Sequence, residues 1–182
     1  MIVMRALPGL ALGLAACASV PAAPAAPHLP AGLYGVYEDN DTGAINQSSW
    51  AFASPNNTRG DPVDAARAVI ALEYLPGELR HNPRWVGMDS GTKLHVAQAR
   101  DELRRIVGIR PDAPPQAVVN ALLHLSSGLQ FGDEAEVAQA LASPVFTLPP
   151  DQTLRNLSNL PYDRTANLAT AFAEAQVLPD GG

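Results

Sequence analysis

Cysteine is almost absent from this sequence, which has one such residue, Cys17, among 182. A single cysteine excludes an internal disulfide and a cysteine-rich zinc site. Charged residues are also scarce, at 16% against roughly 25% in an average soluble domain. The apolar fraction of 47% is nevertheless ordinary, so the composition predicts one folded domain with terminal extensions and not a disordered chain.

Positive charge and long apolar runs are lacking too. Twelve Lys plus Arg stand against 18 Asp plus Glu, a formal net charge of −6. A surface that binds nucleic-acid phosphates needs a basic excess, so the balance argues against a nucleic-acid partner.

The apolar run at residues 6–16 has only 11 residues, about 16 Å as a helix, whereas a hydrocarbon core is about 30 Å thick. This run is therefore too short for a permanent transmembrane helix.

The short run has instead the form of a secretory signal, because it follows Arg5 in a brief charged start. It ends in Leu14-Ala15-Ala16-Cys17, which resembles the lipobox of bacterial lipoproteins. The resemblance implies removal of residues 1–16, a diacylglycerol on Cys17 and an acylated new amino terminus, palmitate being one such acyl group. Two or three acyl chains hold a protein in a membrane essentially permanently. The alternative is an idle cysteine after a chance apolar run.

The residue after the cysteine bears on localisation. In bacteria that sort lipoproteins by this position, an Asp retains them in the inner membrane, whereas here it is Ala18. The resemblance thus implies an anchor in the outer membrane, with the protein facing the periplasm. The lipid on Cys17 is the only bound group that we expect, and we predict no separate cofactor.

Two segments separate the predicted anchor from the predicted helical domain. Residues 17–30 are rich in Pro and Ala, and they predict an extended tether that places the domain up to roughly 40 Å from the bilayer. Residues 31–60 contain glycine, asparagine and aromatics without a helical period. They predict an irregular collar whose aromatic side chains lie across the helical domain.

From Asp61 onward, helix signals recur and no segment reads as a sheet. The pattern predicts an all-α fold, a small bundle of about five or six helices over residues 61–178, followed by a disordered tail at 179–182. The expected starts and ends are Asp61-Pro62 to Pro76-Gly77, Ser90 or Thr92 to Gly108, Asp112 to Gly128, and then residues 133–141, 149–158 and 163–177.

Basic residues recur on one stripe of the second long helix. Lys93, Arg100 and Arg104 stand at offsets of 0, 7 and 11, and Arg110 lies just beyond. This local basicity predicts contact with an anionic partner, such as an acidic protein, a lipid headgroup or a glycan phosphate. The alternative is a solvated helix face, since Asp101 and Arg105 form an ordinary i, i+4 pair.

Other patterns carry weaker chemistry. Ser90 and Lys93 match the Ser-x-x-Lys spacing of penicillin-recognising enzymes, but the companion motifs are missing, so a helix cap is the preferred interpretation. Residues 38–43 collect oxygen ligands before Gly43, yet EF-hand spacing fails, which favours a solvated turn over a calcium loop. Three of the four histidines lie on different predicted segments with no i, i+4 partner, and we predict no metal site; these three are His81, His95 and His124.

The leading interpretation is a membrane-anchored periplasmic lipoprotein that acts as a non-catalytic binding or assembly accessory of the cell envelope. By analogy, small helical lipoproteins called pilotins chaperone secretin subunits, although no pilotin motif is present. The competing hypothesis is a small envelope enzyme, such as a cell-wall hydrolase, that uses Glu73, Glu78 or Asp89 with a histidine. A third is a purely structural surface lipoprotein.

Overall fold

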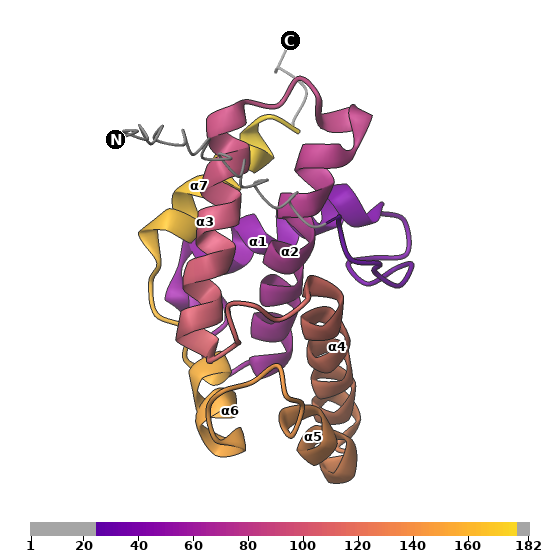
Figure 1. Ribbon diagram of the computed structural model, residues 1–182, viewed down its shortest axis with the longest axis vertical. Helices are drawn as coiled ribbons and strands as arrows, with labels where there is room; N and C mark the ends of the chain where they lie inside the picture. Colours follow the sequence, from indigo (N-terminus) through magenta and orange to yellow (C-terminus); the bar gives the residue numbers. More distant parts are fainter. Residues whose placement is uncertain (1–24, 178–182) are drawn as a thin grey trace, which may run out of the picture.

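The computed structural model describes residues 25–177, which fold into helices joined by short loops (Figure 1). These residues form α1 (Asn40–Ala53), α2 (Pro62–His81), α3 (Ser90–Val107), α4 (Pro115–Phe131), α5 (Glu134–Leu141), α6 (Pro150–Ser158) and α7 (Arg164–Ala175), with the short 3-10 helices η1 (Pro55–Asn57) and η2 (Pro83–Trp85). Over this range no strand forms, and one isolated antiparallel bridge joins Ile109 to Phe146. The predicted all-α bundle is confirmed.

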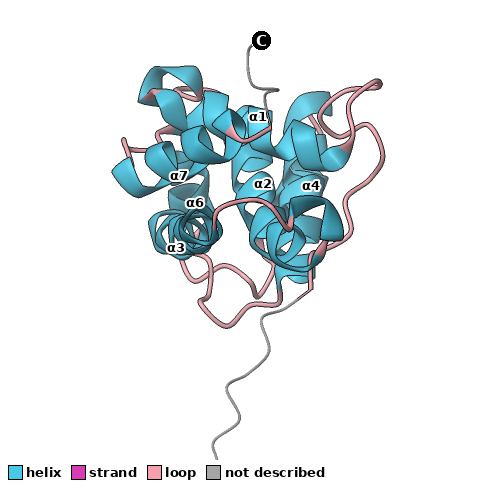
Figure 2. Cartoon of the chain, turned by 90° about the horizontal axis from the view of Figure 1, so that it is seen from above, coloured by secondary structure: helices cyan, strands magenta, loops and turns pink. Residues whose placement is uncertain are grey.

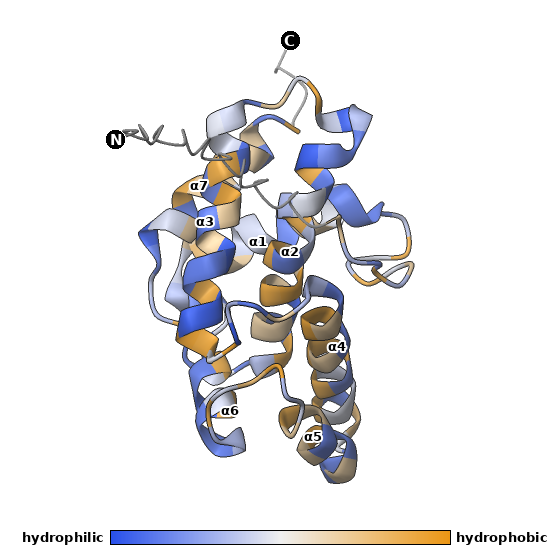
Figure 3. Ribbon diagram, viewed as in Figure 1, coloured by the Kyte–Doolittle hydropathy of each residue, from blue (hydrophilic) through white to orange (hydrophobic). Residues whose placement is uncertain are grey.

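Helix α2 is the centre of the bundle. It contacts α1, α3, α4 and α6, and Figure 2 shows it between α4 on one side and α3 and α6 on the other. Its side chains from Ala65 to Leu75 are almost all buried, as expected for a helix that is covered all round. Helices α3 and α4 alternate hydrophobic and hydrophilic residues along their length (Figure 3), because each turns only one face to α2.

The irregular collar predicted for residues 31–60 is wrong over its central part, where α1 runs from Asn40 to Ala53. Asp39 caps this helix by accepting hydrogen bonds from the backbone amides of Asp41 and Thr42. The helical period is hidden in the sequence because polar Ser48 and Ser49 occupy buried positions beside the apolar ones. Their burial is tolerated because each hydroxyl donates a hydrogen bond.

The expected end of the first long helix at Pro76-Gly77 is also wrong, since α2 continues to His81. Pro76 has no amide hydrogen and costs the helix one hydrogen bond. Continuation buries Leu79 completely, and burial of a leucine side chain contributes about 1.5–3 kcal/mol. Burial of Leu79 thus offsets much of the cost of the proline, and α2 continues past the local helix-breaking signal.

The tether predicted for residues 17–30 is corrected at its end. Residues 25–30, which we call the strap, lie on the helical body: Pro27 is buried and Ala26 packs on Gly77 of α2. Gln116 of α4 holds His28 at both backbone groups, with N–O distances of 2.6 and 3.2 Å. The predicted signal peptide (1–16), Cys17 and the tail at 179–182 lie outside the described residues.

Several helix ends differ from expectation by a few residues. Asp89 caps α3 in place of Ser90 or Thr92, and α4 starts after Pro114 without a side-chain cap, not at Asp112. It also passes Gly128, which is buried against α5. The expected ends and caps at Gly108, Asp133, Pro149 and Asp163 are confirmed. None of the described helices is long and apolar enough to cross a membrane.

Gly77→Ala is expected to loosen the strap. A Cβ atom at Gly77 would lie 2.4 Å from the backbone nitrogen of Ala26, so the strap must shift, and the usual gain of about 1 kcal/mol from replacing a helical glycine is lost. Hydrogen exchange at the His28 amide should accelerate. Gly87→Ala, where a Cβ meets nothing within 4 Å, should leave that amide unchanged. Equal protection of His28 in both variants would contradict this packing.

Candidate functional site

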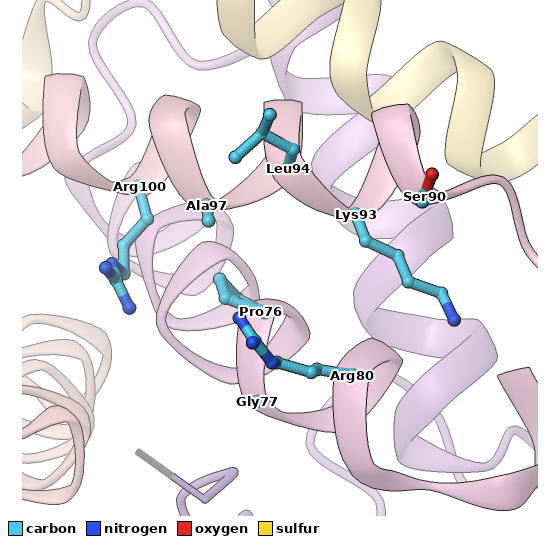
Figure 4. A pocket seen from close by; sticks show the side chains of 8 residues that line it. All are labelled: Pro76, Gly77, Arg80, Ser90, Lys93, Leu94, Ala97 and Arg100. Atoms are coloured by element: carbon cyan, nitrogen blue, oxygen red, sulfur yellow. The ribbon is translucent and has the colours of Figure 1, made fainter. Parts of the chain in front are cut away.

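An open groove lies between α2 and α3. It has a volume of about 620 Å³, which lies within the range of about 300–1,000 Å³ typical of small-molecule sites. We call it the α2–α3 groove, and its lining residues are Pro76, Gly77, Arg80, Ser90, Lys93, Leu94, Ala97 and Arg100. Figure 4 shows Arg80 extending from α2 along the groove toward the side of Arg100, whereas Lys93 points to the opposite end.

Helical spacing places these side chains together. On α3, positions 90, 93, 94, 97 and 100 follow the i, i+3, i+4 and i+7 pattern of one helix face. On α2, Arg80 follows Pro76 by one turn and lies on the same side. Lys93 is held in place because its Nζ donates to the carbonyl oxygen of Trp85 at 2.5 Å. The groove therefore combines three cationic side chains with an apolar wall.

The structure removes Arg104 from the predicted basic stripe. Its side chain is only 5% exposed, and its guanidinium binds the Glu73 carboxylate of α2 through Nε and Nη2 at 2.7 and 2.6 Å. Its Nη1 donates to the carbonyl oxygens of Pro111 and Ala113 at 2.9 and 3.0 Å. Arg104 thus joins α2, α3 and the loop before α4, and it cannot contact an external partner.

Burial and pairing act in opposite directions on this ion pair. Burial raises the pKa of the Glu73 carboxyl, and the hydrogen bonds and charge of Arg104 oppose that rise. Burial also acts to lower the pKa of Arg104, but Glu73 outweighs it and the pKa is raised. A two-point contact this short is typical of a carboxylate with a guanidinium, so we assign both groups as charged.

The other predicted basic residues divide between two places. Lys93 and Arg100 both line the groove, whereas Arg110 lies beyond the far end of α3, where it pairs with Asp112 at 2.6 Å. Arg80 completes the groove and was missed, because the sequence predicted that the helix ends at Pro76-Gly77. The signal that could have found it is the i, i+4 spacing from Pro76 to Arg80, which places it on the α3 side only if the helix continues.

Ser90 and Lys93 both line the groove without forming a nucleophile–base pair. The ammonium group of Lys93 is bound to the Trp85 carbonyl, and Ser90 begins α3. Serine activation requires the base within hydrogen-bond reach of the hydroxyl. The pair therefore contributes polarity to the groove and not a catalytic dyad.

The oxygen-rich segment at residues 38–43 is occupied by structural contacts. Arg84 lies 2.9 Å from Asp39 and 3.5 Å from Asp41, and the Trp85 indole donates to Asp41. The hydrogen bond from the Thr42 amide lowers the pKa of Asp39. Burial acts to raise this pKa, and the hydrogen bond and charge of Arg84 act to lower it. Within residues 25–177, no group of three or more His, Cys, Asp or Glu side chains could hold a metal ion.

The candidate catalytic carboxylates do not converge. Glu73 binds Arg104, Glu78 accepts a hydrogen bond from Asn82, and Asp89 caps α3 by binding the amide of Thr92. Each carboxylate therefore has a structural partner of its own, and no two of them share one.

A second pocket between α4 and α5, of about 540 Å³, does bring a histidine to a carboxylate. His124 Nδ1 lies 3.1 Å from Glu136, and the Ser127 hydroxyl donates to the same carboxylate at 3.2 Å. Glu136 also lies in the first turn of α5, after the cap Asp133. His81 and His95, the other candidates, do not line this pocket.

Comparisons of the chain with protein-family models, with curated proteins and with solved structures found no match. The geometry of the α2–α3 groove therefore carries the functional assignment.

Proposed function

We propose that this protein is a lipid-anchored component of the bacterial envelope whose helical body works by non-covalent binding. The α2–α3 groove is the single observation that carries the binding role, because it is open, of ligand size and lined by three cations. The lipobox-like segment that ends at Cys17 supports the anchor, in the outer membrane by the Ala18 criterion. An assembly accessory that contacts another envelope protein is the related form of this function.

The chemistry of the groove favours binding over catalysis. Its lining contains cations, a serine and apolar side chains, but no carboxylate or histidine that could act as a general acid or base at neutral pH. The acids that the sequence suggested for catalysis are engaged in an ion pair, a side-chain bond and a helix cap. A cationic groove of this type holds an anion in place.

Cys17→Ala is expected to release the protein from the membrane. The native chain, expressed in a proteobacterial host, should fractionate with membranes and carry the added mass of its acyl chains, whereas the variant should lose both, because two or three acyl chains supply the attachment. Intact-protein mass spectrometry with membrane fractionation provides the measurement.

Ala18→Asp serves as the matched variant for this experiment. It keeps Cys17 and should keep the acyl mass, but in a host that sorts by this position it should move from the outer to the inner membrane. A native chain that is soluble and uncut before Cys17 would overturn the anchoring proposal.

The pocket of His124 and Glu136 supports a second candidate, a small envelope hydrolase. Glu136 bound to both a histidine and a serine hydroxyl is an arrangement that can move a proton. Turnover of purified cell-wall peptidoglycan by the native chain, lost in Glu136→Gln, would favour this function. If the protein showed no turnover and bound no ligand in either pocket, the remaining function would be that of a purely structural surface lipoprotein.

A further inference from the structure

The α2–α3 groove has a local charge opposite to that of the whole chain. The protein has a net charge of −6 and a pI near 5.1, yet three of the eight lining residues are cationic and none is acidic. Asp101 binds Arg100 at 2.8 Å and reduces its effect. Within residues 25–177, no carboxylate lies within 4.0 Å of Arg80 or Lys93. The groove therefore attracts an anion.

An apolar wall accompanies these cations. Pro76 on α2 and Ala97 on α3 line the groove between the charged groups, and Leu94 is 58% exposed. A free inorganic anion gains nothing from such a wall. A molecule with an anionic head and an apolar continuation satisfies both halves of the groove, since a phosphate pairs with Arg80, whose side chain extends along the groove (Figure 4), and the apolar part covers Leu94.

The position of the strap links the groove to the membrane, and this step rests on the proposed function. Gly77, a groove residue, packs on Ala25 and Ala26 of the strap. Cys17 is eight residues before Ala25, and an extended chain spans at most about 3.6 Å per residue, or about 29 Å. A lipid on Cys17 therefore keeps the groove within about 29 Å of the bilayer, so that lipid headgroups are the most concentrated amphiphilic anions near it.

We propose that the α2–α3 groove binds the phosphate headgroup of an anionic phospholipid from the membrane in which the protein is anchored. Arg80 binds the phosphate, Lys93 and Arg100 extend the positive field from the two ends of the groove, and Leu94 with Ala97 contacts the first part of the acyl chains. Such binding orients the helical body, because the anchor restrains only the N-terminus. The side of the body that bears α2 and α3 faces the bilayer.

Native mass spectrometry of the full chain in nonionic detergent tests this proposal. The chain is titrated with phosphatidylglycerol and, separately, with phosphatidylcholine, whose headgroup has no net charge. Phosphatidylglycerol should bind more tightly. Each basic residue near an anionic lipid contributes about fivefold to affinity, so Arg80→Gln with Lys93→Gln should weaken phosphatidylglycerol binding about 25-fold and leave phosphatidylcholine binding unchanged.

The matched control removes the same charge elsewhere. Arg105 and Arg164 are exposed and do not line the groove, so Arg105→Gln with Arg164→Gln should retain the native affinity. Circular dichroism with thermal unfolding establishes that both double variants fold. Equal binding of the two lipids, or equal loss in both double variants, would overturn the proposal.

Two further measurements distinguish lipid binding from phosphate binding and test the anchor separately from the groove. Inorganic phosphate that displaces phosphatidylglycerol at comparable concentrations would show a site for a small soluble phosphate, and so overturn the lipid assignment. The same spectra report the acyl mass on Cys17. Selective phosphatidylglycerol binding by a chain without acyl mass would refute the lipid anchor and support lipid binding by the groove. An acylated chain that binds both lipids equally would support the anchor and refute lipid binding by the groove.

Discussion

Arg104→Met is expected to destabilise the protein by about 3–5 kcal/mol, because it leaves the buried Glu73 carboxylate without its cation. Glu73 is 1% exposed, and both of its oxygens accept hydrogen bonds from Arg104. The substitution also leaves the carbonyl oxygens of Pro111 and Ala113 without the Nη1 donor. Denaturant unfolding at pH 7 measures the loss, and a change below about 1 kcal/mol would contradict the assignment.

The loss in Arg104→Met should also depend on pH, with a sign set by Glu73. Burial raises the pKa of this carboxyl, and in the variant Arg104 no longer opposes the rise. Below a pH of about 4.3, the pKa of this carboxyl in the unfolded chain, it is neutral in both the folded and the unfolded state, so folding buries no charge there. The penalty grows as pH rises toward the folded pKa, so the variant should lie closer to the native protein at pH 5 than at pH 8.

Two controls separate charge from packing in this experiment. Arg104→Met combined with Glu73→Leu has no buried charge and should recover part of the stability and lose the pH dependence. Glu73→Gln alone leaves the guanidinium without a counter-charge, and its penalty should not decrease at pH 5. If Arg104→Met were equally destabilised at pH 5 and pH 8, Glu73 would not be a charged group in the folded protein.

Gly108→Ala is expected to destabilise by about 2–4 kcal/mol, from two sources that add. Gly108 follows α3 with φ of +82°, a conformation that side chains rarely adopt. A Cβ there would also lie 2.4 Å from the Cγ and Cδ1 atoms of Leu148. The Gly108 carbonyl accepts a hydrogen bond from the Thr147 amide at 2.8 Å. Displacement of Leu148, the next residue, therefore strains this hydrogen bond.

Gly132→Ala is the control for the backbone part of this effect. Gly132 has φ of +70°, and a Cβ there meets nothing within 4 Å. Its substitution should cost only about 1–2 kcal/mol, and the difference between the two variants measures crowding at Leu148. Chemical denaturation of both proteins under one condition suffices. Equal losses would show that Leu148 moves aside without cost.

Sequence patterns predicted most of the helical body because their causes are local. Asp133 and Asp163 cap helices through bonds to amides three residues away, and Gly108 ends α3 by adopting positive φ. The apolar stripe of α3 was also predicted, and Val96, Ala99 and Leu103 are buried. Such signals act within one or two turns, so one segment contains all the information needed.

Interactions between distant segments decided what the sequence patterns misjudged. The partner of Arg104, Glu73, is 31 residues away, so the spacing that predicted an exposed stripe could not show that Arg104 is buried. Helix α1 escaped detection because Ser48 and Ser49 are buried, and the Ser49 hydroxyl bonds to Glu174, 125 residues away. The strap likewise lies on α2 and α4 only through contacts with Gly77 and Gln116.

For the candidate site, sequence alone determined that basic residues gather on α3 and that Cys17 stands where a lipoprotein signal requires it, which stays a prediction outside the described residues. Tertiary structure decided which cations share a cavity. It buried Arg104 and brought Arg80 into the same groove as Lys93 and Arg100, because packing of Leu79 carries α2 past Pro76. Helical periodicity specifies a face within one helix, whereas a binding site requires two faces whose relation only the packed core establishes.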